Sequence, residues 1–209
     1  MKILLVDDHE VVRRGVRDLL IREYPAARIT EAEETAGAVA LLQNPVWDLL
    51  LLDINLPGRG GLEVLAEAQR LCPSTPVLVL SMYPESEFAV RAFKLGAAAY
   101  LNKASAGAEL LAAVRKVLVG GKYVSTELAE KLVSQLGSDS SNDPHETLSS
   151  REFQVLRLVA LGQTIKEIAL ELSLSEKTIS TYRGRISKKL RLSTAVEIAR
   201  YALKHGLVE

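Results

Sequence analysis

The run Leu49–Leu52 is uninterrupted leucine and ends in Asp53, ahead of a Pro-Gly loop at 57–58. A strand that is buried on both faces of a sheet has a continuous apolar run of this kind. Three more short apolar runs lead into polar residues: Ile3–Val6 before Asp7-Asp8, Val77–Leu80 before Ser81, and Ala99–Leu101 before Lys103. The carboxyl ends of parallel strands line one crevice, where ligands bind. Three carboxylates, a hydroxyl and an ammonium are therefore expected at one sheet edge, in a site suited to Mg²⁺ and a phosphoryl group.

Strand and helix patterns alternate over the first 120 residues. Strands are predicted near 2–7, 28–32, 49–53, 76–80 and 98–102, and helices near 9–23, 35–43, 61–71, 86–95 and 105–119. Five such units with short connections predict an α/β fold, a doubly wound five-stranded parallel sheet of (βα)5 type. In the first helix we expect an apolar stripe of Val12, Val16, Leu19 and Leu20 to face the core, with Arg13, Arg14 and Arg17 outside it.

The stretch 137–144 contains no apolar residue and is predicted to be a linker, after a further helix near 125–136. Beyond it the pattern is purely helical, with helices near 150–161, 165–171, 176–190 and 195–205. Their starts carry capping boxes at Ser149/Glu152, Thr164/Glu167 and Thr194/Glu197, and an N-cap at Ser175. We expect a domain over 1–120, a connecting helix and flexible linker over 121–147, and a small all-α four-helix domain over 148–209.

Composition limits the class of protein. A chain of 209 residues suits two domains, and its single cysteine, Cys72, cannot form an internal disulfide. There is no apolar run of membrane-helix length and no signal-peptide pattern, so we expect a cytoplasmic protein without a membrane partner. The net charge is zero, but residues 148–209 carry 11 lysines and arginines against 6 acids, which favours an anionic partner for that part.

The polar strand ends suggest phosphoryl chemistry. Asp7, Asp8 and Asp53 can hold one Mg²⁺ through oxygen ligands. Asp53 is the best nucleophile because it stands alone at the middle strand end, with Lys103 to pair with phosphate oxygens and Ser81 to donate a hydroxyl. Each residue taken singly is more often a solvated polar group that ends a strand. All of them at successive strand ends are not expected by chance.

These residues resemble the receiver domain of two-component response regulators. The match covers residues 1–120 and rests on Val6-Asp7-Asp8-His9, Leu52-Asp53-Ile54-Asn55-Leu56-Pro57-Gly58, Leu80-Ser81 and Tyr100-Leu101-Asn102-Lys103. The resemblance implies that a histidine kinase phosphorylates Asp53. It also implies that Asp8, Asp53 and the Asn55 backbone carbonyl ligate Mg²⁺, with Asp7 acting mainly through water. Ser81 and Tyr100 resemble the paired switch residues, although Tyr100 could equally be an ordinary buried aromatic.

Two other readings of this region compete with the switch. The glycines at 58, 60 and 61 lack the spacing of a dinucleotide-binding loop and follow Asp53 and Pro57, so they indicate a turn and a helix entry. A phosphohydrolase that uses an aspartyl phosphate commonly needs a second acid two residues after the nucleophile. That position is Asn55, which cannot transfer a proton. The sequence therefore favours a switch that holds its phosphate over an enzyme.

The predicted helix over 176–190 has two different faces. Its apolar stripe is Ile179, Tyr182, Ile186 and Leu190, and its other face carries Lys177, Ser180, Thr181, Gly184, Arg185 and Lys188. A short helix, a tight turn at 172–174 and a basic second helix make a helix-turn-helix, whose second helix enters the major groove. The competing interpretation is a small helical bundle with a solvated basic face.

The C-terminal residues resemble a LuxR-type module through Leu148-Ser149-Ser150-Arg151-Glu152, Lys166-Glu167-Ile168-Ala169 and Ser175 to Tyr182. With the receiver, the chain resembles the NarL/FixJ subfamily of response regulators, which are phosphorylation-controlled transcription regulators. The resemblance implies that positions 180, 181 and 184 face base edges, while Lys177, Thr178 and Lys188 lie near phosphates. At 184 a longer side chain is common in the family, so Arg185 and DNA shape are expected to contribute to specificity. We expect a homodimer on paired DNA half-sites, with RNA polymerase as a further partner.

Overall fold

The chain divides into two compact units, Met1–Asp139 and Ser140–Glu209. The computed structural model describes residues 1–44, 46–56, 60–82, 85–104, 106–125, 128–129, 144–172 and 174–208. Most of the predicted helix near 125–136 and nearly all of the predicted linker over 137–144 lie outside the described residues. The two units are therefore considered one at a time.

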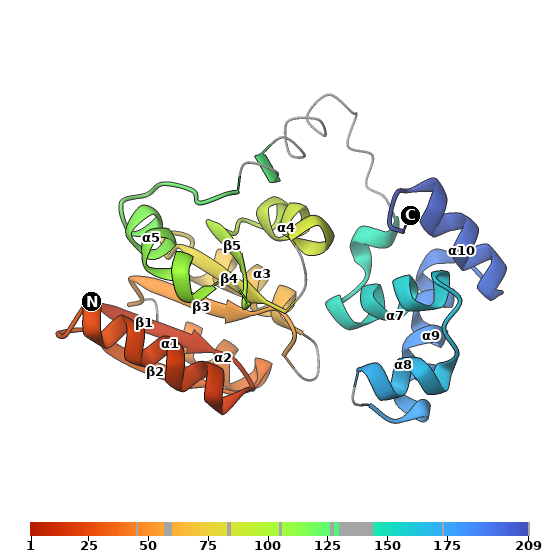
Figure 1. Ribbon diagram of the computed structural model, residues 1–209, viewed down its shortest axis with the longest axis horizontal. Helices are drawn as coiled ribbons and strands as arrows, with labels where there is room; N and C mark the ends of the chain where they lie inside the picture. The colour runs from red at the N-terminus through yellow and green to blue at the C-terminus, as the bar shows by residue number, and fades with distance from the viewer. Residues whose placement is uncertain are drawn as a thin grey trace. The chain divides into compact units, whose positions relative to one another are not determined.

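The N-terminal unit is a five-stranded parallel sheet in the order β2-β1-β3-β4-β5, with helices on both of its faces (Figure 1). Strands and helices alternate along the chain: β1 (Lys2–Val6), α1 (Glu10–Glu23), β2 (Arg28–Ala32), α2 (Thr35–Leu42), β3 (Leu49–Asp53), α3 (Gly61–Leu71), β4 (Val77–Ser81), α4 (Glu85–Lys94), β5 (Ala99–Asn102) and α5 (Ala106–Leu118). The predicted doubly wound (βα)5 fold is confirmed, with element ends that differ by a residue or two at most.

Alternate strand residues explain how the sheet holds its helices. On one face, Ile3, Leu5, Leu49 and Leu51 pack in a buried cluster with residues of α1 and α5, such as Leu110. The residues between them point to the opposite face because successive side chains of a strand alternate. All five residues of β3 are buried, so this strand has no solvent-facing side and carries Asp53 in its last position.

One predicted feature of α1 is wrong. Arg13 was expected outside the apolar stripe, but it is only 6% exposed and shares the buried face with Val16 and Leu20. The spacing from 13 to 16 to 20 is three and then four residues, which places the three side chains on one helix face. Arg14, in contrast, is exposed as predicted.

The C-terminal unit consists of a short 3-10 helix, η1 (Pro144–Thr147), and the helices α7 (Ser150–Ala160), α8 (Ile165–Glu171), α9 (Glu176–Leu190) and α10 (Ala195–Lys204). The three predicted capping boxes are present, and Ser175 caps α9 by accepting from the Thr178 amide. Its core is formed by buried apolar side chains from every helix: Phe153, Leu156, Ile168, Ile179, Ile186 and Ile198. Within the described part of the chain, no helix combines the length and apolar character needed to cross a membrane.

Candidate functional site

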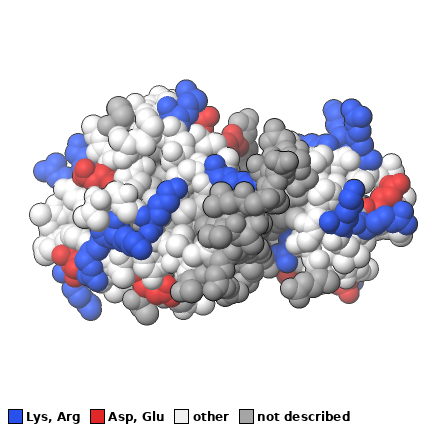
Figure 2. Space-filling model, turned by 90° about the horizontal axis from the view of Figure 1, so that it is seen from above, with Lys and Arg blue, Asp and Glu red and all other residues white. Residues whose placement is uncertain are grey.

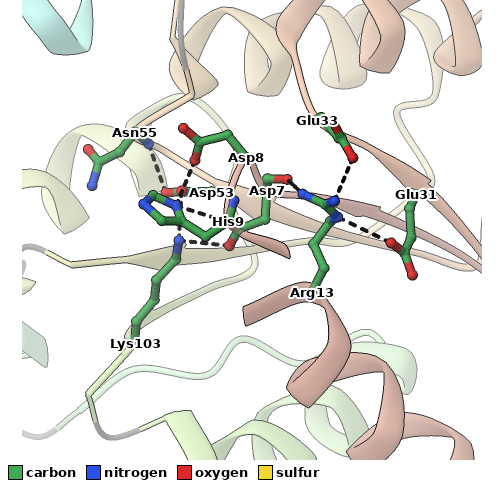
Figure 3. A network of polar contacts seen from close by, with 9 residues as sticks. All are labelled: Asp7, Asp8, His9, Arg13, Glu31, Glu33, Asp53, Asn55 and Lys103. Atoms are coloured by element: carbon green, nitrogen blue, oxygen red, sulfur yellow. Dashed lines mark hydrogen bonds and ion pairs between the residues drawn. The ribbon is translucent and has the colours of Figure 1, made fainter. Parts of the chain in front are cut away.

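An acidic pocket forms at the carboxyl edge of the sheet. Asp7 follows β1, Asp53 ends β3 and Lys103 follows β5, and the strand registers bring these ends to the same edge. Figure 3 shows the three side chains converging, with Asp8 and His9 beside them; they come from β1, β3 and β5, and β4 lies between the last two. Asp7 and Asp53 are both fully buried, which separates them from the solvated polar residues that usually end strands.

Lys103 joins the two buried acids. Its ammonium nitrogen donates a hydrogen bond to Asp53 Oδ2 at 2.7 Å and lies 2.7 Å from Asp7 Oδ2. Burial raises the pKa of Asp53 above its ordinary value, because it disfavours the ionised form. Lys103 counteracts this rise, while the charge on Asp7 adds to it. The pocket thus holds two buried carboxylates and one ammonium, and it favours a further positive charge.

The pocket fits a divalent cation. Asp7, Asp8, His9 and Asp53 each offer a ligand atom, and these atoms lie within 4.8 Å of one another. Asp7 and Asp53 are both buried and share the one ammonium of Lys103, which lies 2.7 Å from an oxygen of each. Two carboxylates beside a single ammonium leave a net negative charge, which a further cation would neutralise. The oxygen-rich donor set is the type that Mg²⁺ prefers.

The loop after β3 fixes the Asp53 carboxylate. The Asn55 amide donates to Asp53 Oδ1 at 2.8 Å, and the Gly61 amide donates to the Ile54 carbonyl at 3.0 Å. A Cβ atom at Gly61 would lie 2.1 Å from the Asp53 carbonyl oxygen, so only glycine lets the start of α3 approach β3 this closely. Gly60, with φ of 86°, provides the left-handed turn into the helix. Residues 57–59 lie outside the described part of the chain.

The two residues expected to form a switch are both buried. Ser81 ends β4 and Tyr100 lies in β5, and neither has any exposed surface. The Ser81 carbonyl accepts a 2.7 Å hydrogen bond from the Lys103 amide, which places Ser81 at the same edge as the acids. The burial of Tyr100 suits an ordinary core aromatic as well as a switch residue.

Sequence reasoning missed two residues at this site. The His9 ring nitrogen Nδ1 lies 2.7 Å from Asp8 Oδ1, and the Arg13 guanidinium donates to the Asp7 carbonyl at 2.7 Å. His9 could have been found from its position next to Asp8. Arg13 could have been found from its helical spacing to Val16 and Leu20.

The C-terminal unit presents the second candidate site on α9. The residues of α9 that are exposed are Lys177, Ser180, Thr181, Gly184, Arg185 and Lys188, whereas Ile179, Ile186 and Leu190 are buried. Tyr182 is half-buried, with the Arg185 guanidinium 6.0 Å from its ring centre. Residues 148–209 carry 11 lysines and arginines against 6 acids, and Figure 2 shows basic side chains on the surface of this unit. An exposed basic helix behind a short helix and turn has the geometry that enters a DNA major groove.

Two hydroxyl groups on α9 form hydrogen bonds with residues at or near the start of the same helix. Thr181 Oγ1 donates to the Lys177 carbonyl at 2.9 Å, and Thr178 Oγ1 lies 2.8 Å from Ser175 Oγ. The Thr181 hydroxyl is thus already paired within the helix, although the residue is exposed. At Gly184, an added Cβ would meet no atom within 4 Å, so the fold itself does not require glycine there.

Lys189 has a different role from its neighbour Lys188. Its ammonium lies 2.7 Å from the buried Glu152 carboxylate and 3.0 Å from the Thr147 carbonyl, and so ties the end of α9 to the start of α7. Burial acts to raise the pKa of Glu152, but hydrogen bonds from Lys189 and Ser149 outweigh burial and lower it. Sequence reasoning did not identify this anchor.

Two family models match the chain, and together they span most of it. Residues 3–115 match the response regulator receiver domain, and residues 146–202 match the luxR family of bacterial regulatory proteins. The first match covers the unit with the acidic pocket, and the second covers the unit with α9.

Relatives extend over the full length. The chain is 34% identical to the response regulator UvrY of Escherichia coli K12 over 208 residues, covering 99% of this chain and 95% of that protein. It is 33% identical to the response regulator GacA of Pseudomonas aeruginosa PAO1 over 210 residues, covering 100% and 98%.

Solved structures agree with this assignment. The RcsB–DNA complex is similar with a TM-score of 0.58 and 25% identity, covering 100% of this chain and 99% of that chain. RcsB of Salmonella enterica serovar Typhimurium, bound to the rprA promoter in the presence of the phosphomimetic BeF3−, is similar with a TM-score of 0.57 and 26% identity, covering 96% and 98%. The chain therefore belongs to the NarL/FixJ-type two-component response regulators, phosphorylation-controlled transcription regulators with a receiver domain and a LuxR-type DNA-binding domain.

Proposed function

We propose that this chain is the output component of a phosphorelay in which a histidine kinase phosphorylates Asp53 and thereby controls binding to double-stranded DNA. The observation that carries the proposal is the setting of Asp53. Its carboxylate is buried at the end of the central strand, 2.7 Å from Lys103 and next to Asp7 and Asp8. A nucleophile, a phosphate-binding cation and cation ligands are thus brought within reach of one transferring group.

Magnesium is the proposed cofactor of the phosphorylation. Asp8, Asp53 and the Asn55 backbone carbonyl would hold it, with Asp7 acting through water. The ligand atoms of Asp7, Asp8 and Asp53 lie within 4.8 Å of one another, which supports a cation at this place. When bound, Mg²⁺ neutralises charge on the phosphoryl oxygens. The domains are proposed to run over 1–120 and 148–209, with a connecting helix and linker over 121–147 between them.

In the transfer step, a carboxylate oxygen of Asp53 attacks phosphorus while the phosphorus–nitrogen bond to the kinase histidine breaks. Lys103 starts from Asp53 Oδ2 and pairs with a phosphoryl oxygen once it is attached. The Ser81 hydroxyl then donates to the phosphoryl group, and Tyr100 packs inward behind it. Because Asn55 replaces the acid that a hydrolase needs at this position, the phosphate is held rather than turned over. The chain is therefore proposed to be a regulator without an enzymatic activity of its own.

The DNA site is proposed on α9. Ser180, Thr181 and Gly184 face base edges, Arg185 adds to specificity, and Lys177, Thr178 and Lys188 lie near phosphates. Two copies bind paired half-sites, since one helix-turn-helix contacts too few base pairs to select a site in a genome. On α10, Ile198 and Ala202 are buried in their own unit, whereas Val196 and Leu203 are 69% and 59% exposed and can contact a second copy. Bound to DNA in the cytoplasm, the dimer would contact RNA polymerase.

Mass spectrometry of the phosphorylated chain tests the proposal. The full-length protein is incubated with acetyl phosphate and Mg²⁺, then reduced with borohydride, which marks the acyl phosphate. One modified site is expected, at Asp53, and Asp53→Asn should take up no phosphate. Asp48→Asn is the matched control, because Asp48 is an exposed acid near the other end of the same strand. Uptake at the native rate by Asp53→Asn would show that the assignment is wrong.

A further inference from the structure

Arg13 is a buried arginine on α1, only 6% exposed beside the acidic pocket, whereas arginine side chains are mostly exposed in folded proteins. Its three donors reach three different acceptors (Figure 3). Nη1 donates to the Asp7 carbonyl at 2.7 Å, Nε donates to Glu31 at 3.1 Å, and Nη2 donates to Glu33 at 2.5 Å. One of the acceptors is thus the backbone of a pocket residue, while the other two lie at and beyond the end of β2.

The hydrogen bond from Arg13 to the Asp7 carbonyl adds to other hydrogen bonds that hold Asp7 in place. The Asp7 amide donates to the Ala32 carbonyl at 3.1 Å, and the Asp7 carboxylate accepts from the His9 amide at 2.8 Å. With the carbonyl held by Arg13, every polar backbone group of Asp7 has a partner. A peptide unit is planar, so fixing the Asp7 carbonyl also fixes the direction in which the chain enters Asp8. The Asp8 carboxylate is therefore oriented through this peptide.

We propose that Arg13 is a positioning residue for the divalent cation of the pocket, acting through the Asp7 carbonyl rather than by contact with the metal. The inference rests on the proposed function of the pocket. Groups in the outer shell of a metal site orient the direct ligands, and their loss typically weakens metal binding by about 10–100-fold. Arg13 holds the peptide between Asp7 and Asp8, one a proposed water-mediated ligand and the other a direct one.

Arg17, on the same helix, is a useful comparison because it binds Glu31 in an ion pair. It pairs with the other oxygen of Glu31 at 3.0 Å, but its side chain is 39% exposed, and its ion pairs with described residues are with Glu31 and Asp18. An ion pair with Glu31 therefore does not require burial. The additional burial of Arg13 accompanies the carbonyl contact, and the planar guanidinium makes this contact while its other nitrogens bind Glu31 and Glu33.

Binding of Mn²⁺ to the full-length protein, followed by the electron paramagnetic resonance signal of free Mn²⁺, tests this inference. Arg13→Met keeps much of the apolar length but removes the donors, and we expect its dissociation constant to rise about tenfold. Arg17→Met, the matched control, should bind within about twofold of the native chain. Thermal unfolding of both variants separates a loss of fold from a loss of the site.

The outcomes are distinct. If Arg13→Met is folded and binds Mn²⁺ as the native chain does, Arg13 has only a structural role and the inference fails. If Arg13→Met does not fold, Arg13→Lys decides, because it keeps the charge but replaces three guanidinium nitrogens, each on a different acceptor, with one nitrogen. Native affinity overturns the inference, and weakened binding supports it. The proposed function of the pocket is tested separately with Asp53→Asn and Asp8→Asn. If the native chain binds no Mn²⁺, or if these variants bind it as well as the native chain does, the proposed function has failed, independently of Arg13.

Discussion

At the scale of single residues, the ionised Asp53 carboxylate destabilises the fold because it is buried. Burial raises its pKa above the ordinary 3.8, so folding favours the protonated form. The stability from this preference is complete below the unfolded-state pKa and is lost as the pH rises through the folded-state pKa. At neutral pH the ionised Asp53 carboxylate therefore lowers the free energy of unfolding, and a bound cation or phosphorylation can remove this destabilisation.

Asp53→Asn should accordingly raise the melting temperature at pH 7 in the absence of divalent cations. A gain of about 1 kcal/mol corresponds to roughly 2–4 °C for a protein of this size. The gain should shrink as the pH is lowered through the raised pKa of the folded Asp53, because the native carboxyl then becomes protonated. Mg²⁺ should reduce or reverse the difference in melting temperature between the two proteins, because it stabilises the native chain, which binds it better than Asp53→Asn does.

The exposed Asp18→Asn provides the control, because its carboxylate lies 64% exposed on α1. Scanning calorimetry over this pH range measures both variants. If Asp53→Asn melts below the native chain at pH 7 without Mg²⁺, the ionised Asp53 carboxylate does not destabilise the fold and the prediction is wrong.

At the scale of elements, α9 carries two adjacent lysines that the structure gives different tasks. Lys188 is exposed and has no ion-pair partner among the described residues, while Lys189 is bound to Glu152 and Thr147. Lys188→Ala should weaken binding to specific and random DNA alike and lower the salt slope by about one unit. Lys189→Ala should leave the salt slope unchanged and lower the free energy of unfolding by about 1–3 kcal/mol, because a buried carboxylate loses its partner.

Fluorescence anisotropy on a random duplex at several salt concentrations, together with urea unfolding, distinguishes these effects. Each lysine serves as the control for the other, since both substitutions remove one charge from the same turn of the helix. A Lys189→Ala chain with native stability and a reduced salt slope would show that Lys189 also faces DNA.

The same contrast shows what could be predicted from sequence. Apolar runs, capping boxes and turn residues are local signals, and they predicted the order and type of the described elements and the meeting of Asp7, Asp53 and Lys103 at one edge. Arg13 was wrongly placed on the solvent side and the role of Lys189 was not identified, because a long cationic side chain is usually solvated. Each is buried or tied down by acceptors distant in sequence, such as Glu31 for Arg13 and Glu152 for Lys189. Such acceptors become visible only when the chain is folded.

At the scale of the whole molecule, the two units can be coupled only if phosphorylation changes the balance between states that bind DNA differently. A tenfold change in DNA affinity corresponds to about 1.4 kcal/mol, which lies within the usual range of such couplings. The central claim is therefore that a covalent change at Asp53 is detected as a change in DNA binding by the C-terminal unit.

The most direct test measures the affinity of the full-length chain for a duplex selected from a random library by the phosphorylated protein. Native protein and Asp53→Asn are titrated by fluorescence anisotropy with and without acetyl phosphate, both in the presence of Mg²⁺. The account predicts that acetyl phosphate tightens binding of the native chain by about tenfold or more, and that Asp53→Asn does not respond. An equal response of both proteins, or no response of a native chain shown by mass spectrometry to carry phosphate on Asp53, would contradict it.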